Sequence, residues 1–214
     1  LTARHGEIKA IAGSYGTGKS QLASAILGIL PDNATVQGHL HYKGQELTPE
    51  RQKMLRGTEI ALVPQSVAYL DPLMKIGPQV DGAGKQPLAE KRRKLFDRFH
   101  LPQQTEQLYP FQLSGGMARR VLVSTALITD AELIIADEPT PGMSLDQALE
   151  ALTMFREMAD EGKAVILITH DIDLAFEFAD RVAVFYAGTT VETAPAADFK
   201  AGPEALRHPY SKAL

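Results

Sequence analysis

The feature that most constrains the fold of this chain is the segment GSYGTGKS at residues 13–20, which follows an apolar run at residues 8–12. It matches G-x-x-x-x-G-K-[ST], a glycine-rich loop that joins a strand to a helix and surrounds phosphates with backbone N–H groups. In this pattern Lys19 pairs with the β- and γ-phosphates, and the Ser20 hydroxyl binds Mg²⁺. We therefore predict a nucleotide site whose binding residues are Gly13, Ser14, Tyr15, Gly16, Thr17, Gly18, Lys19, Ser20 and Gln21.

Short apolar runs alternate with longer amphipathic segments along most of the chain, which is typical of a mostly parallel sheet covered by helices. Residues 66–127 lack strand signals, so we expect a helical insertion or subdomain there. The expected strands are 8–12, 36–42, 59–63, 133–136, 165–169, 182–186 and 190–193, and the expected helices are 18–30, 89–99, 114–129, 145–160 and a short helix from 172.

The composition argues against several kinds of site and partner. The 214 residues carry a formal net charge of −4, so no overall basic field is available to bind nucleic acid or an anionic membrane. The chain has no cysteine, which excludes disulfides, thiolate zinc sites and iron–sulfur clusters. The apolar runs are of strand length, and residues 1–7 show no secretory leader. We therefore expect a cytoplasmic protein.

Two weaker patterns are interpreted as surface features. The run KRRK at residues 91–94 predicts a solvated helix face more readily than a nucleic-acid site. His39 and His41 alternate along an expected strand and form a candidate metal pair, but no third ligand lies nearby in the sequence. We expect both histidines to be ordinary surface residues.

Two adjacent carboxylates, Asp137 and Glu138, end the apolar run at residues 133–136. An acid at the end of a strand near a phosphate-binding loop is placed to hold the Mg²⁺ shell, usually through water. The next carboxylate can polarise a water molecule for in-line attack on the γ-phosphate. The alternative is a pair of solvated acids at a strand end, but beside residues 13–20 we expect a catalytic pair.

Polar side chains also follow two other expected strands. Gln65 comes after residues 60–64, and His170 comes after residues 165–169. Ligands of open parallel sheets bind at the carboxyl ends of the strands, which is where these side chains are expected. A lone histidine at a strand end is more often structural, but this position favours a role at the phosphate site.

The most specific feature is the sequence LSGGM at residues 113–117. A Ser-Gly-Gly segment that opens a helix forms a second anion-binding turn, about a hundred residues after the first. One nucleotide does not need two such turns from the same chain. The economical interpretation is that each turn serves a nucleotide held by a different subunit.

In their order and spacing, these motifs resemble those of the ATP-binding subunits of ABC transporters, along almost the whole chain. The resemblance implies an α/β fold: a P-loop NTPase core with a mostly parallel sheet from residues 1–65 and 128–214. It also implies an antiparallel β part near the N-terminus and a helical subdomain at residues 66–127 that carries the signature motif, residues 113–117. The expected activity is ATP hydrolysis with Mg²⁺ as cofactor.

The resemblance also implies partners and a location. We expect a homo- or heterodimer with a second ABC ATPase, bound to membrane permease subunits at the cytoplasmic face of the inner membrane. An extracytoplasmic substrate-binding protein is expected in the complete system, and nucleic acid is not an expected partner. Such an ATPase is expected to be peripheral to the membrane.

By the same resemblance, each motif residue has a role. Glu138 is the general base, His170 is the switch residue that contacts the γ-phosphate, and Gln65 senses Mg²⁺ and water and couples to the membrane subunits. The Mg²⁺ set is Ser20, Gln65 and Asp137. The residues expected to bind the partner's ATP in a head-to-tail dimer are Leu113, Ser114, Gly115, Gly116 and Met117.

Three segments resemble one branch of the family, the peptide and nickel importers. They are LDPLMKIG at residues 70–77, YPFQ at 109–112 and HPYSKAL at 208–214. Import of a peptide, nickel or related small cargo is therefore expected. The alternative is a non-transport ABC ATPase that acts on ribosomes or DNA, although such relatives tend to carry tandem domains, coiled coils or zinc-binding cysteines. A P-loop kinase or GTPase would not explain residues 113–117.

Two departures from the family pattern are notable. The aromatic residue that usually stacks on adenine is not found in the short segment before Gly13, so we expect the numbered chain to be a trimmed subunit. Ser144 stands where the pattern DEPT-x-x-LD has an aspartate, unless a two-residue insertion makes Asp146 the equivalent residue. We hypothesise that Ser144 faces a related but non-identical partner ATPase that compensates for the lost charge.

Overall fold

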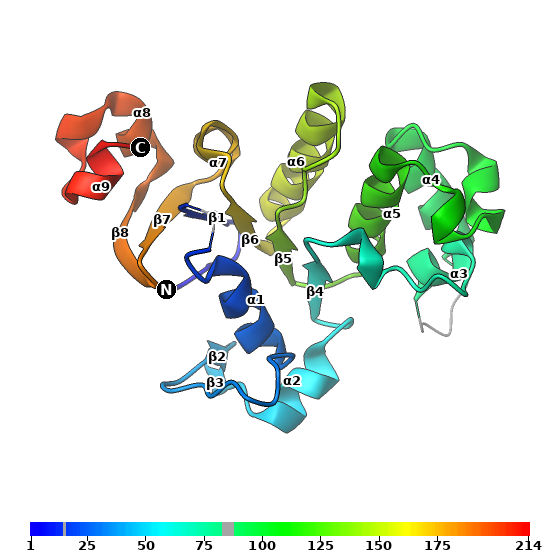
Figure 1. Cartoon of the computed structure of the whole chain (residues 1–214), viewed down its shortest axis with the longest axis horizontal. Helices are drawn as coiled ribbons and strands as arrows, with labels where there is room; N and C mark the ends of the chain where they lie inside the picture. Colours follow the sequence, from blue (N-terminus) through cyan, green and yellow to red (C-terminus); the bar gives the residue numbers. More distant parts are fainter. Residues whose placement is uncertain (15, 83–87) are drawn as a thin grey trace.

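The computed structural model describes residues 1–14, 16–82 and 88–214, which form an α/β fold built on a six-stranded sheet (Figure 1). Its strands are β1 (Ile8–Ala12), β4 (Ile60–Val63), β5 (Leu133–Asp137), β6 (Ala164–Thr169), β7 (Arg181–Tyr186) and β8 (Thr189–Pro195). The order across the sheet is β4–β5–β6–β1–β7–β8, and every pair is parallel except β7–β8. A separate antiparallel pair consists of β2 (His41–Tyr42) and β3 (Gln45–Glu46).

Helices cover both faces of the large sheet. Figure 1 shows α3, α4 and α5 gathered beyond the β4 edge, and α8 and α9 beyond the β8 edge. Among the described residues, no helix has both the length and the apolar character needed to cross a bilayer. The helices are α1 (Lys19–Leu27), α2 (Pro49–Leu55), α3 (Ile76–Asp81), α4 (Ala89–Arg98), α5 (Gly115–Leu127), α6 (Leu145–Asp160), α7 (Ile172–Phe178), α8 (Ala196–Ala201) and α9 (Pro209–Lys212), with 3₁₀ turns η1 (Val67–Tyr69), η2 (Gln103–Gln107), η3 (Pro110–Gln112) and η4 (Pro203–Ala205).

The strand β5 shows how the sheet separates two cores. Ile134 and Ala136 pack with residues of α5 and α6, whereas Leu133 and Ile135 pack with residues of α1 and α2. Successive side chains of a strand point to opposite faces, so a strand that is apolar throughout is buried on both sides. This arrangement confirms the predicted, mostly parallel sheet covered by helices.

The segment predicted to be helical contains no strand within residues 66–82 and 88–127. Its apolar side chains, such as Ile76 and Phe96, belong to the same cluster as Ile134 of the sheet. The helix α5 connects the two parts because it packs against β4 as well as against α3 and α4. The division into a core and a helical subdomain remains a prediction.

The strand predicted at residues 36–42 is wrong over most of its length. Only His41–Tyr42 is a strand, joined to β3 by a two-residue turn at Lys43 and Gly44, whose φ angles are 51° and 74°. Val36 is 54% exposed, and among the described residues no other strand pairs with residues 36–40. The apolar alternation therefore lacks the pairing partner that a longer strand needs.

The helix α2 was not predicted, although the sequence holds its signal. The Thr48 side chain accepts a hydrogen bond from the Arg51 N–H, and Pro49 occupies the first helical position. A threonine cap followed by proline is a common start of a helix.

The interpretation of residues 91–94 as a solvated face is wrong for Arg92. This arginine is buried, and its guanidinium donates hydrogen bonds to Asp81 and, at 2.8 Å, to Glu106. Arg92 therefore links α4 to α3 and to η2. His39, in contrast, is exposed beside Glu46 on the small hairpin, as expected for a surface residue.

Candidate active site

The glycine-rich loop joins β1 to α1, as predicted. A Cβ atom at Gly13 would lie 2.2 Å from the Phe185 carbonyl oxygen of β7, so only glycine fits where the loop meets the sheet. Gly18, with a φ of 92°, caps the start of α1. The first turn of α1 therefore directs its free N–H groups toward the loop, which is the arrangement that favours phosphate binding. Tyr15 lies outside the described residues.

Lys19 is held by the loop itself. Its Nζ donates hydrogen bonds to the carbonyl oxygens of Gly13 and Ser14, each at 2.9 Å. Burial lowers the pKa of Lys19 from its ordinary value, and the negative charges of Glu138 and Asp137 oppose this effect. The structure thus places the predicted phosphate-binding cation beside the predicted acids.

Ser20 and Asp137 connect α1 to the end of β5. The Ser20 hydroxyl donates a 3.0 Å hydrogen bond to Asp137 Oδ1. Burial raises the pKa of Asp137 above its ordinary value, although the hydrogen bond from Ser20 opposes this rise. Adjacent hydroxyl and carboxylate oxygens fit Mg²⁺, which prefers oxygen ligands and keeps part of its water shell.

Glu138 follows β5 in a strained conformation. Its φ is 48°, in the left-handed region that costs a non-glycine residue roughly 1–3 kcal/mol. Its N–H donates to the Ile168 carbonyl at 2.9 Å, which fixes the backbone against β6. The carboxylate Oε1 lies 2.9 Å from His170 Nδ1, so the structure brings together the two residues predicted as base and switch.

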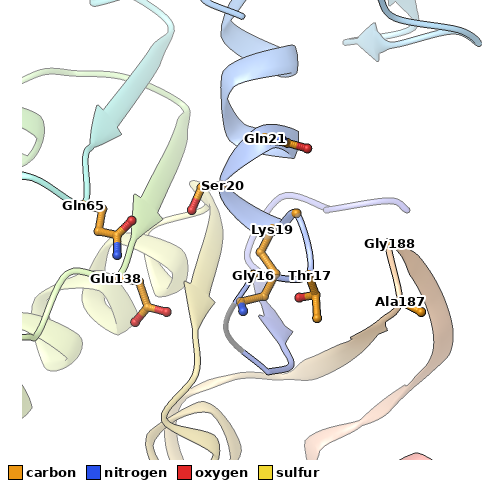
Figure 2. Close-up of a pocket in the computed structure, with 10 residues that line it drawn as sticks. Gly16, Thr17, Lys19, Ser20, Gln21, Gln65, Glu138, Ala187 and Gly188 are labelled. Carbon is orange, nitrogen blue, oxygen red and sulfur yellow. The ribbon is translucent and has the colours of Figure 1, made fainter. Parts of the chain in front are cut away.

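A cavity of about 580 Å³ opens between these residues, within the size range of small-ligand sites. Figure 2 shows Gln65 and Glu138 on one side of it and the loop with Lys19 and Thr17 in the middle. Gln65, which follows β4, is exposed. The opposite side is formed by Ala187 and Gly188 in the turn between β7 and β8, which was not predicted. The described lining residues are Gly16, Thr17, Gly18, Lys19, Ser20, Gln21, Gln65, Glu138, Ala187 and Gly188.

A second unpredicted contact reaches the loop from α9. The Tyr210 hydroxyl lies 2.6 Å from the Ser14 hydroxyl, and the Tyr210 ring lies 4.4 Å from the ring of Tyr186, measured between centroids. The Tyr210 N–H also donates to His208 Nδ1 at 3.2 Å. Residues so far apart in sequence give no local signal of such a contact, except that Tyr210 belongs to the motif at residues 208–214.

The signature residues open α5, as predicted. The Ser114 hydroxyl accepts a hydrogen bond from the Met117 N–H at 3.3 Å and caps the helix, which begins at Gly115. Leu113 and Met117 pack against the core. None of residues 113–117 is among the described residues that line the cavity. The prediction that these residues serve the partner's nucleotide therefore stays a prediction.

Ser144 has a clear structural role. Its hydroxyl accepts a hydrogen bond from the Gln147 N–H at 3.4 Å, and the Gln147 side chain accepts one from the Ser144 N–H at 3.3 Å. This reciprocal pair is a capping box at the start of α6. Asp146 instead lies within the first turn of that helix. Aspartate and serine cap helices about equally well, so the local structure accepts either residue at position 144.

Comparison with protein families supports the motif assignment. Residues 1–141 match the family model described as ABC transporter. The chain is 34% identical to the oligopeptide transport ATP-binding protein OppD of Salmonella typhimurium, over 100% of this chain and 67% of that protein. It is 35% identical to OppD of Lactococcus lactis subsp. cremoris, with the same coverage of each chain. A putative peptide import ATP-binding protein of Brucella abortus is 35% identical over 97% of this chain and 66% of its own length.

Solved structures show the same fold. A dimeric bacterial ABC transporter cassette superimposes with a TM-score of 0.80 at 25% identity, over 92% of this chain and 88% of that one. The same cassette in a post-hydrolysis state, bound to ADP and inorganic phosphate, gives a TM-score of 0.79 with the same identity and coverage. The likeness covers both the parallel sheet and the helical part.

Proposed function

This chain belongs to the ABC transporter family, and from that premise we propose that it is the ATPase that powers peptide import through partner permease subunits. The family assignment follows from the match over residues 1–141 and from relatives at 34–35% identity. Members of this family bind and hydrolyse ATP, and a structural relative is described with ADP and phosphate. The chain is therefore an ATPase that binds ATP.

The observation that carries the proposal is the meeting of four segments at one edge of the sheet. The loop at residues 13–20 and the acids at the end of β5 are joined by the hydrogen bond between Ser20 and Asp137, 3.0 Å long. The residue after β6 adds the contact between His170 and Glu138, 2.9 Å long. Gln65, which follows β4, lines the same cavity as Lys19 and Glu138.

In the proposed reaction, Lys19 and the N–H groups of the loop bind the phosphates of ATP. Ser20, Asp137 and Gln65 would hold Mg²⁺, which supplies charge neutralisation to the phosphates when bound. Glu138 orients a water molecule for in-line attack on the γ-phosphate and accepts its proton. The imidazole of His170, beside Glu138, holds that carboxylate and contacts the γ-phosphate. The strained backbone of Glu138 supports this role, because such strain gathers at functional residues.

We also propose how two such chains cooperate. The residues of the signature motif, 113–117, contact the γ-phosphate of ATP held by a second ABC ATPase in a head-to-tail dimer. A relative at 25% identity is described as a dimeric cassette, which supports dimerisation. In this proposal, residues 66–127 form the helical subdomain that carries the signature to the partner.

The cargo is proposed from the relatives. The relatives from Salmonella, Lactococcus and Brucella are named for oligopeptide transport and peptide import, which favours a peptide cargo over nickel. The same names favour permease partners at the inner membrane over ribosomes or DNA. The chain then binds the cytoplasmic face of the permeases, and an extracytoplasmic substrate-binding protein delivers the peptide.

The test is ATP-dependent peptide uptake by proteoliposomes that contain the complete transporter, with wild-type chain or the Lys19→Ala variant. Uptake by the wild type and its loss in the variant support the proposal. A matched control is Lys53→Ala, because Lys53 is exposed on α2, away from the cavity. A pull-down from native membranes that recovers ribosomes or DNA without any permease would overturn the import function.

A further inference from the structure

Two adjacent arginines on α5 are buried, and each binds a different part of the chain. Arg119 donates from Nη1 to the Pro64 carbonyl oxygen at 3.0 Å and from Nη2 to the Gln65 carbonyl oxygen at 2.5 Å. Arg119 therefore holds the backbone of Gln65, whose side chain lines the nucleotide cavity. The same helix begins with the signature turn capped by Ser114, five residues earlier in the sequence.

The surroundings of Arg119 make this contact costly to maintain. The residue is 7% exposed, and burial lowers the pKa of its guanidinium from the ordinary value. Its Nε has no hydrogen-bond partner among the described residues. The charges of Glu138 and Asp137 oppose the effect of burial. A neutral side chain could fill the space without the cost of a buried charge, so the charge and its fork geometry call for a functional reason.

We propose that Arg119 is a positioning residue for Gln65, and that it mechanically links the signature turn to the nucleotide cavity of the same chain. The proposal rests on the proposed function of Gln65 and of the signature motif. A shift or rotation of α5, when its start binds the partner's nucleotide, moves the guanidinium and with it the backbone of Gln65. The planar guanidinium binds two successive carbonyl groups. A movement of α5 therefore displaces the backbone of Gln65 in a more defined direction than a single hydrogen bond would allow.

The neighbouring Arg120 provides a structural comparison on the same helix. It is also buried, and it also binds carbonyl groups, those of Phe99 at 2.7 Å, His100 at 3.3 Å and Gly116 at 3.1 Å. These partners lie in the helical part of the chain, not beside Gln65. Arg120 thus shares the burial and the type of bonding of Arg119 but lacks its hydrogen bond to Gln65.

The first test compares ATP hydrolysis by the complete transporter with Arg119→Gln, Arg119→Lys and Arg120→Gln. If Arg119 positions Gln65, Arg119→Gln lowers kcat roughly tenfold to a hundredfold, because small misplacements of an active-site group have effects of that size. The KM for ATP stays within about twofold, since the loop that binds phosphate is untouched. Arg119→Lys recovers part of kcat because its ammonium reaches one of the two carbonyl groups.

The second test follows the segment around Gln65 directly. The chain contains no tryptophan, so Tyr69→Trp introduces a single tryptophan. Tyr69 and Gln65 line the same small cavity, together with Ser20 and Asp137. ATP should change the emission of this tryptophan when the rest of the chain is wild type, and also in the Arg120→Gln background. In the Arg119→Gln background the change should be lost, while binding of a fluorescent ATP analogue is retained.

The outcomes separate the inference from the proposed function. If the wild-type transporter does not hydrolyse ATP, the proposed function fails before Arg119 is considered. If the wild type hydrolyses ATP but Arg119→Gln keeps its kcat and its tryptophan response, the inference is wrong. The inference is also wrong if Arg119→Gln and Arg120→Gln lower Tm and kcat and weaken ATP binding to the same extent, since that pattern indicates loss of the fold. Partial recovery by Arg119→Lys, with unchanged KM, supports it.

Discussion

The hydroxyl of Tyr210 lies 2.6 Å from that of Ser14, so α9 is tied directly to the phosphate-binding loop. The preceding segment is itself anchored, because the Glu192 carboxylate accepts hydrogen bonds from the N–H groups of Arg207 and His208, at 2.8 and 3.0 Å. The side of the loop that faces β7 is therefore supported by a segment far away in the sequence.

Loss of the Tyr210 hydroxyl should weaken ATP binding without loss of fold. Tyr210→Phe keeps the ring against Tyr186 but removes the bond to Ser14. A neutral hydrogen bond contributes about 0.5–1.5 kcal/mol, which corresponds to a roughly twofold to tenfold rise in KM for ATP. We expect kcat and Tm to change little, as measured by steady-state hydrolysis and thermal unfolding.

The matched control is Tyr186→Phe, which removes a hydroxyl from the other ring of the pair. That hydroxyl has no hydrogen bond among the described residues, so KM should stay at the wild-type value. Equal effects of the two variants would show that the ring pair, and not the bond to Ser14, supports the loop.

The helix cap at Ser144 predicts the effect of two substitutions on stability. Ser144→Ala removes the acceptor for the Gln147 N–H and should lower the free energy of unfolding by about 0.5–2 kcal/mol. Ser144→Asp supplies an equivalent cap and should leave the free energy of unfolding within a few tenths of a kcal/mol of the wild-type value. Urea unfolding measures both, and an equal loss in the two variants would contradict the role of the cap.

The same position tests the hypothesis of a non-identical partner. If Ser144 faces a compensating loop of a related ATPase, the isolated chain should hydrolyse ATP slowly and without cooperativity. Ser144→Asp should then raise the rate of the isolated chain. Full cooperative hydrolysis by the purified chain alone, with no effect of Ser144→Asp, would exclude this hypothesis.

The burial of Asp137 predicts how stability depends on pH without nucleotide. Because burial raises its pKa in the folded chain above the ordinary 3.8, the folded state holds this proton more tightly than the unfolded state does. Stability should therefore fall as the pH rises through the window between the two pKa values and then remain lower.

The variant Asp137→Asn isolates this effect because an amide does not ionise. The Tm of the variant minus the Tm of the wild type should be larger at about pH 8 than at about pH 4, since only the wild type loses the contribution of the Asp137 proton between them. Thermal unfolding at a series of pH values measures the difference. A difference that stays constant, or shrinks toward high pH, would contradict the cost assigned to the buried carboxylate.

The parts of the site that the sequence predicted are those with local signals. The glycine, lysine and serine spacing of residues 13–20 predicts a phosphate-binding loop between a strand and a helix. The acids at the end of β5 close an apolar run that is buried on both faces. Because parallel strands end at one edge, the meeting of Glu138 with His170 also followed from the alternation of strands and helices.

The remaining features depend on tertiary contacts. Neither Arg119 nor Tyr210 carries a local mark of its partner, because the partner carbonyls and hydroxyl lie 54, 55 and 196 residues away. The left-handed backbone of Glu138 also follows from its setting between β5 and β6 and not from its residue type. The expected strand at residues 36–42 failed for the same reason, since a strand depends on the presence of a partner.

The central claim, that Glu138 is the base for ATP hydrolysis at this cavity, is tested most directly by the steady-state ATPase rate of Glu138→Gln. The amide keeps the size of the side chain but accepts a proton poorly, so turnover should be abolished while ATP binding is kept and the ATP-bound dimer is stabilised. Analytical ultracentrifugation with ATP measures the dimer in the same preparation. Steady-state hydrolysis at the wild-type rate by this variant would contradict the claim.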